Sequence, residues 1–182
     1  MVEDIFSGSS DDLPLAFFPN ANNKGYCRAI LDPVSLQILS KHVGSVEEPA
    51  DRTYLWRTLA DHVALGKLPP TAFLRSVFEH LQKEHIEFGI QIIIDKAMYM
   101  VNNFFDHESL VEMRTRVFYT LLAKLEATQS PSMQNLLATN MLSVASVDKL
   151  DILISWLSAG AICSESASSL QKILPLSKAL RY

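Results

Sequence analysis

Apolar residues at helical spacing, interrupted at short intervals by proline or glycine, constrain the fold of this chain more than any other feature. The pattern begins after Asp32-Pro33, where a carboxylate that can cap a helix precedes a proline at the first helical position. Ser130-Pro131 repeats this arrangement, and Gly44 and Gly66 end earlier segments. Helices of about 10–20 residues joined by short loops pack as antiparallel neighbours. The sequence therefore predicts a mainly α protein, with antiparallel helix pairs in an α-α superhelix of the HEAT or armadillo kind.

One segment leaves the choice between helix and strand open. The run Phe88–Asp95 is rich in β-branched residues, which favour a strand. The longer window keeps helical spacing, with apolar residues at Ile86, Ile90, Ile93, Ala97 and Val101. The length of the segment favours one helix, buried on more than one side.

The N-terminal part differs from the rest of the chain. Residues 1–12 are polar and acidic, and we expect a loose leader there. Residues 13–32 predict a β-hairpin, with an apolar run, a turn at Asn22–Gly25 and a strand from Tyr26 to Leu31. An isolated hairpin is only marginally stable in water, so this one should pack on the helices of residues 33–182.

Composition and charge exclude several functional classes. The 182 residues are 48% hydrophobic and 20% charged, which fits one folded domain. A net charge of −4 without a basic run argues against binding to nucleic acid or to an anionic membrane. The first residues lack the order of a signal peptide, and no apolar run is long enough to span a bilayer. Cys27 and Cys163 are isolated, so we expect a reducing, cytoplasmic setting.

The sequence holds one cluster of metal-ligand type, formed by Glu79, His80, Glu84 and His85. His80 and Glu84 are four residues apart and share a helix face, whereas His85 lies about 100° further round the helix than Glu84 and points away from that face. Two ligands do not make a structural zinc site, so the favoured interpretation is a solvated helix end without metal. A small hydrolase that uses this cluster is one functional hypothesis, and it is weaker than the two that are given at the end of this section.

Other polar groups also have structural interpretations. Asp106-His107-Glu108 is expected to cap a helix, with its acidic residues near the positive end of the helix dipole. Asp61-His62 is expected at the surface, or with the histidine at a helix C-terminus. Trp56 and Trp156 lie on apolar stripes and are expected in the core.

Two of the arginines remain as candidates for contacts. Arg28 lies on the predicted junction strand and either contacts a substrate or ties the hairpin to the helices. Arg52 and Arg57 lie on one rim of their helix, where solvent exposure is the expected state. We assign no catalytic or metal-binding residue, and keep Arg28 and Arg52 as possible substrate or interdomain contacts.

The junction also carries a family resemblance. Asn20, Gly25-Tyr26, Arg28 and Leu31-Asp32 follow the pattern N-x4-G-Y-x-R-x2-[YL]-D. This pattern resembles the junction of aminopeptidase N and puromycin-sensitive aminopeptidase, which are gluzincin zinc aminopeptidases. A second stretch, from Asp51-Arg52 through the apolar helix to Glu84, is similar to the family pattern that follows. Leu153–Gly160 and the last three residues give a weaker match.

The resemblance implies a domain without catalytic residues. The G-x-M-E-N motif that binds the substrate amine and the zinc-binding H-E-x-x-H motif are both missing from this sequence. The catalytic zinc would then belong to another domain of a parent enzyme, and this chain alone would have no aminopeptidase activity. We expect the helical domain to be cut short at Tyr182.

The leading hypothesis is a non-catalytic C-terminal helical domain that covers the zinc site and shapes peptide access in a parent aminopeptidase. Its expected partners are the missing catalytic and β domains and the peptide substrate of the parent, or a second copy of the chain. Apolar residues crowd both ends of the chain and suggest self-association. The alternative is a free-standing α-solenoid scaffold for protein–protein interaction.

Overall fold

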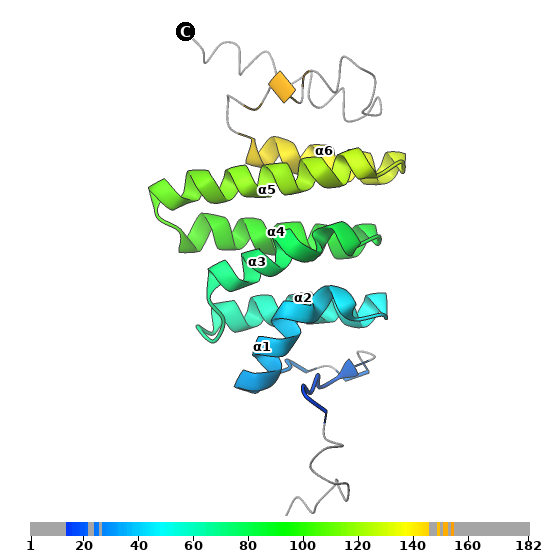
Figure 1. Ribbon diagram of the computed structural model, residues 1–182, viewed down its shortest axis with the longest axis vertical. Helices are drawn as coiled ribbons and strands as arrows, with labels where there is room; N and C mark the ends of the chain where they lie inside the picture. The colour runs from blue at the N-terminus through cyan, green and yellow to red at the C-terminus, as the bar shows by residue number, and fades with distance from the viewer. Residues whose placement is uncertain are drawn as a thin grey trace, which may run out of the picture.

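The computed structural model describes residues 14–21, 24–25, 27–145, 149, 151–152 and 154. Six α-helices make up most of this described part, which contains no strand (Figure 1). They are α1 (Pro33–His42), α2 (Pro49–Ala64), α3 (Pro70–His80), α4 (Glu87–Phe104), α5 (His107–Ala127) and α6 (Pro131–Val144). The prediction of a mainly α protein is confirmed, and Trp156 lies outside the described residues.

The helices begin where local side chains can satisfy their free N–H groups. The Asp32 carboxylate accepts hydrogen bonds from the N–H groups of Val34 and Ser35, and Asp106 and Ser130 cap α5 and α6 in the same way. Proline occupies the first turn of α1, α2, α3 and α6, where a missing N–H costs nothing. Gly66 follows α2 with φ of 69°, a left-handed conformation that favours glycine.

The ambiguous segment is one helix. The α4 helix runs from Glu87 to Phe104, and its buried residues are Gly89, Ile90, Ile93, Ile94, Ala97, Met100 and Val101. Phe88 and Tyr99 on the same helix are exposed, so its remaining face is open to solvent in the described part. Packing of these buried side chains in the core stabilises the helix and outweighs the local β propensity of the segment.

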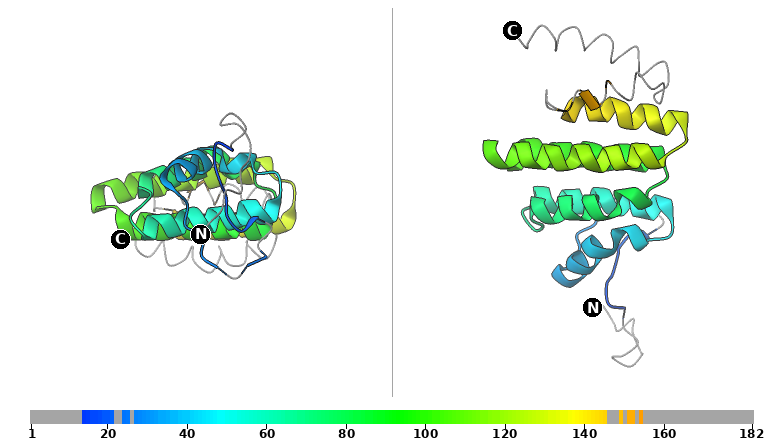
Figure 2. Two further views of the ribbon diagram at one scale, coloured as in Figure 1. Left: turned by 90° about the horizontal axis from the view of Figure 1, so that it is seen from below. Right: turned by 45° about the horizontal axis from the view of Figure 1, so that its top comes forward.

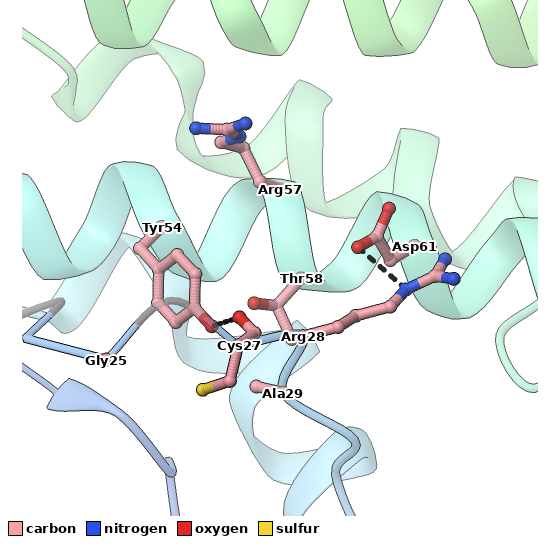
Figure 3. Close-up of a pocket in the computed structure, with 8 residues that line it drawn as sticks. All are labelled: Gly25, Cys27, Arg28, Ala29, Tyr54, Arg57, Thr58 and Asp61. Carbon is pink, nitrogen blue, oxygen red and sulfur yellow. Dashed lines mark hydrogen bonds and ion pairs between the residues drawn. The ribbon is translucent and has the colours of Figure 1, made fainter.

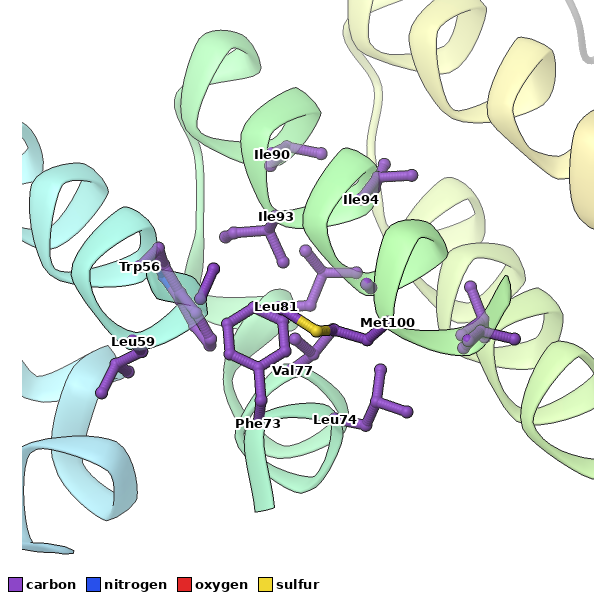
Figure 4. Close-up of a cluster of buried hydrophobic side chains, with 14 of the residues drawn as sticks. Trp56, Leu59, Phe73, Leu74, Val77, Leu81, Ile90, Ile93, Ile94 and Met100 are labelled. Carbon is purple, nitrogen blue, oxygen red and sulfur yellow. The ribbon is translucent and has the colours of Figure 1, made fainter. Parts of the chain in front are cut away.

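The helices pack through both consecutive and alternate contacts. Helix α3 contacts α1 and α5, while α4 contacts α2 and α6, and each helix from α2 to α5 also contacts the next. Seen from below, along the axis that is vertical in Figure 1, the helices lie one behind another in two rows (Figure 2, left). The buried core takes residues from all six helices of the described part. Where α2, α3 and α4 meet, the Trp56 ring lies edge-on to Phe73 at 5.8 Å between centroids (Figure 4).

The predicted hairpin is not seen in the described residues of the junction. In the described residues, the two limbs bond to helix side chains, and the bonds between them are those of the Asn20 side chain with the N–H and carbonyl of Gly25. The N–H of Phe17 donates to the Ser35 hydroxyl on α1 at 2.9 Å, and the Tyr54 hydroxyl on α2 donates to the Cys27 carbonyl at 3.1 Å. A backbone group that a helix side chain already satisfies has no need of a partner strand.

Candidate functional site

The segment that carries Arg28 is held against α2 by a buried histidine. His62 is fully buried, and its Nε2 accepts a hydrogen bond from the Leu31 N–H at 3.0 Å. Its Nδ1 lies 2.8 Å from the Thr58 carbonyl oxygen, to which it must donate. These two partners require the neutral ring with the proton on Nδ1. His62 does lie in the last turn of α2, but the expectation that it lies at the surface is wrong.

A cavity of about 510 Å³ lies between this segment and α2 (Figure 3). Arg28 and Asp61 form an ion pair across part of it, with 3.1 Å between Nε and Oδ2 and with 50% and 42% of their side chains exposed. The other lining residues are Gly25, Cys27, Ala29, Tyr54, Arg57 and Thr58. We call this cavity the junction pocket. Because both charges of the pair face solvent, the pair can exchange partners at little cost.

Arg57 extends the junction pocket along the surface of α2 and α4. It lines a second cavity of about 400 Å³ with Ile86 and Phe88, and a third of about 280 Å³ with Asp95 and Lys96. Among the described residues it has no ion pair or hydrogen bond to its side chain. Phe88 is 68% exposed beside it. The surface therefore offers an unpaired guanidinium next to an open aromatic ring.

Arg52 lies in a different environment from Arg28. Its Nε is 2.6 Å from the Glu84 carboxylate, and its terminal nitrogen donates to the carbonyls of Val46 and Glu47. The side chains of Arg52 and Glu84 are only 10% and 1% exposed. The interpretation of Arg52 as a solvated residue is therefore wrong, because its guanidinium is committed to groups inside the domain.

Two further donors complete this buried network. The Trp56 indole N–H donates to the same Glu84 oxygen at 3.2 Å, and the Lys124 ammonium on α5 donates to the carbonyls of Gln82 and Glu84. Burial lowers the pKa of Lys124, and the nearby Glu84 carboxylate opposes this shift. The network joins α2, the connection from α3 to α4, and α5.

The metal-like cluster is dispersed by this arrangement. Helix α3 ends at His80, so Glu84 lies beyond the helix and does not share a face with that histidine. His80 is buried and its Nε2 lies 2.8 Å from the Lys41 carbonyl, while His85 is exposed. The interpretation of the cluster as a solvated helix end is wrong for His80 and Glu84. The described residues contain no group of three or more potential metal ligands.

The prediction for Asp106 is confirmed. Its carboxylate accepts a hydrogen bond from the Ser109 N–H at 2.9 Å, at the start of α5. Hydrogen bonds from the N–H and then the hydroxyl of Ser109 lower the pKa of Asp106. This aspartate therefore acts as a helix cap.

The sequence analysis missed the two α2 side chains that dock the junction, Tyr54 and His62. A signal for His62 was present, because it follows Leu55 and Leu59 at the spacing of one helix face, and both leucines are buried. No local pattern identifies the bond from Tyr54 to Cys27, because its partners are 27 residues apart.

A family model described as ERAP1-like C-terminal domain matches residues 16–158, which is most of the chain. The chain belongs to this family. The match confirms the resemblance to the C-terminal region of the aminopeptidase N family, and covers the junction, α1 to α6 and the residues just beyond them. No curated protein and no solved structure gave a match. No helix in the part that the structure describes is long and apolar enough to cross a membrane.

Proposed function

We propose that this chain is the part of a zinc aminopeptidase that covers the catalytic domain and limits which peptides reach it. The family match over residues 16–158 carries the proposal. The zinc, its ligands and the general base would belong to the catalytic domain of the parent enzyme. The helices would then act as a wall of a peptide chamber, built as helix pairs of an α-α superhelix.

The surface around Arg57 supports a role in peptide contact. A peptide presents carboxylates and apolar side chains, and the junction pocket and its neighbours present Arg28, Arg57 and the exposed Phe88 ring. Arg28 is the better candidate of the two arginines predicted as contacts, because Arg52 is committed to Glu84. We propose that Arg28 and Arg57 contact the substrate or the facing domain.

The N-terminal end supports contact with another domain. Leu15 and Phe17 are 85% and 62% exposed. Large apolar side chains that stand open in this way next to a domain junction fit a surface covered by the preceding β domain. In the isolated chain the same residues would favour self-association. The free thiol of Cys27 fits the reducing, cytoplasmic setting that we propose.

The test is a chimaera in which residues 16–158 replace the corresponding region of a family aminopeptidase. We expect zinc-dependent hydrolysis of aminoacyl-coumarin substrates by the chimaera and none by the purified 182-residue chain. In the chimaera, Arg57→Ala should change kcat/KM for long peptides by about threefold to tenfold and leave the short substrate unaffected, since a contact is worth about 1 kcal/mol.

Lys83→Ala, at an exposed cation that lines none of these cavities, is the control and should leave both rates unchanged. Zinc-dependent turnover by the isolated chain would contradict the proposal. So would a chimaera whose selectivity for peptide length is unchanged by both Arg28→Ala and Arg57→Ala. A stable, strictly monomeric chain at high concentration would favour the free-standing scaffold.

A further inference from the structure

A fourth cavity, of about 310 Å³, lies between α1 and α3 and shares no lining residue with the junction pocket. Its apolar lining includes Leu36 of α1, Leu68 of the turn before α3 and Ala72 of α3. Leu36 and Leu68 are each 6% exposed, so the floor of the cavity belongs to the core. We call this cavity the α1–α3 groove.

Hydrogen bonds hold the walls of the α1–α3 groove in place. The buried Ser76 hydroxyl on α3 lies 2.6 Å from the Ser40 carbonyl of α1 and 3.1 Å from the Ala72 carbonyl. The N–H groups of Lys67 and Leu68 both donate to the His62 carbonyl, which fixes the turn after Gly66. A groove whose walls are already bonded loses little entropy when a ligand enters it.

The rim of the groove is positively charged, although the whole chain is acidic. Lys41, Lys67 and Arg75 are exposed and come from three different walls, against a single lining carboxylate at Glu79. Three cations and one anion give the lining a net charge of +2, whereas the chain carries −4. No ion pair joins any of these cations to a carboxylate in the described part of the chain.

We propose that the α1–α3 groove binds a peptide segment in which an apolar side chain is flanked by carboxylates. The apolar floor takes the side chain, and the three cations on the rim take the carboxylates, which they can reach without first breaking a bond of their own. A volume of about 310 Å³ holds one or two side chains, not the face of a helix. The recessed floor also favours a side chain that projects into it over a flat lipid surface.

The experiment uses the full 182-residue chain and a fluorescein-labelled peptide of sequence Asp-Glu-Leu-Phe-Glu-Asp, with binding measured by fluorescence anisotropy at low ionic strength. We expect saturable binding that weakens with added salt. Arg75→Glu and Lys67→Glu should each weaken it by about tenfold or more, because they replace an attraction with a repulsion. Lys83→Glu, an exposed charge change of the same kind outside the groove, should leave it unchanged.

Two further comparisons separate the apolar and the charged parts of the site. Replacing Leu-Phe in the peptide by Ala-Ala, or its acids by Asn and Gln, should each weaken binding. Ala72→Trp should fill the groove and block binding while the circular-dichroism spectrum stays helical; if that variant does not fold, Lys67→Glu in the exposed turn decides the question. Equal loss from Lys83→Glu and Arg75→Glu would overturn the proposal. So would equal binding of the Ala-Ala peptide, or binding to phosphatidylserine vesicles that responds to the same variants.

Discussion

Helix α2 contributes to two ion pairs that involve arginine, and the two pairs differ in almost every physical respect. The Arg28–Asp61 pair spans 3.1 Å at the rim of the junction pocket, and about half of each side chain is exposed. The Arg52–Glu84 pair spans 2.6 Å, is nearly closed to solvent, and shares its carboxylate with the Trp56 indole. The first pair is available to a partner, whereas the second is part of the domain's interior.

Two arginines that both form an ion pair with helix α2 or from it can therefore have different roles, one in binding and one in stability. A buried charge must keep all of its partners, because an unpaired charge in the core is costly. An exposed charge contributes little to stability and remains free to bind something else. Arg28 is therefore the candidate for a functional contact, and Arg52 a structural one. Four substitutions test this division.

Arg52→Ala should have the largest effect. It leaves the Glu84 carboxylate buried with the Trp56 N–H and without its counter-ion. We expect the free energy of unfolding to fall by about 3–5 kcal/mol, measured by urea denaturation. The exposed Arg75→Ala should change it by less than about 0.5 kcal/mol. Equal effects of the two substitutions would break the comparison.

His62→Leu should come next. It removes the acceptor of the buried Leu31 N–H, which then has no partner, and releases the segment that presents Arg28. The expected loss is about 1–3 kcal/mol in the free energy of unfolding. His85→Leu is the matched control at an exposed site and should have a small effect. If His62→Leu is also near neutral, the junction does not depend on this bond.

Lys124→Met should cost less, about 1–2 kcal/mol at neutral pH, because relief from burying the cation offsets part of the lost bonds to Gln82 and Glu84. Burial places the pKa of Lys124 below its usual 10.5 in the folded protein. At a pH between the pKa of Lys124 in the folded protein and its pKa in the unfolded chain, the unfolded chain binds more protons than the folded protein. Lys124 therefore makes the free energy of unfolding rise as pH increases through this range.

The Lys124→Met variant should lack this gain, which urea denaturation at neutral pH and near pH 10 would detect. Lys83→Met, at an exposed lysine in the connection between α3 and α4, should keep the pH dependence of the unsubstituted chain. A variant at position 124 with an unchanged pH profile would contradict the assignment of the shift to Lys124.

Arg28→Ala should have the smallest effect, about 0–1 kcal/mol in the free energy of unfolding. A double-mutant cycle with Asp61→Ala should give a coupling energy below about 1 kcal/mol, and one that falls with added salt. A coupling as large as that between Arg52 and Glu84 would show that both pairs are structural, and would leave Arg28 no functional role on these grounds.

The helices were predictable from the sequence because their signals are local. Asp32 with Pro33, and Ser130 with Pro131, lie within a few residues of the N–H groups they serve. The length of the segment from residue 86 also identified α4 correctly. The hairpin was wrong because the partners of its backbone are side chains on α1 and α2, far along the chain.

The two kinds of arginine could not be separated from sequence alone. Arg52 and Glu84 are 32 residues apart and belong to different elements, so no helical spacing relates them. The same holds for Arg28 and Asp61, which are 33 residues apart. A charge pattern along one helix reports which side chains share a face, but not which neighbouring segment covers that face.

The position of Glu84 in a connection, and not in a helix, has a consequence for how the protein opens. Its carboxylate accepts from α2, and its carbonyl accepts from Lys124 near the end of α5, 40 residues later. Opening either helix end leaves an oxygen of the buried Glu84 without its donor, which loosens the hold of this connection on the other helix. Native-state hydrogen exchange should therefore find amides in the first half of α2 and in the last turns of α5 exchanging in one cooperative unit, with a common free energy of opening.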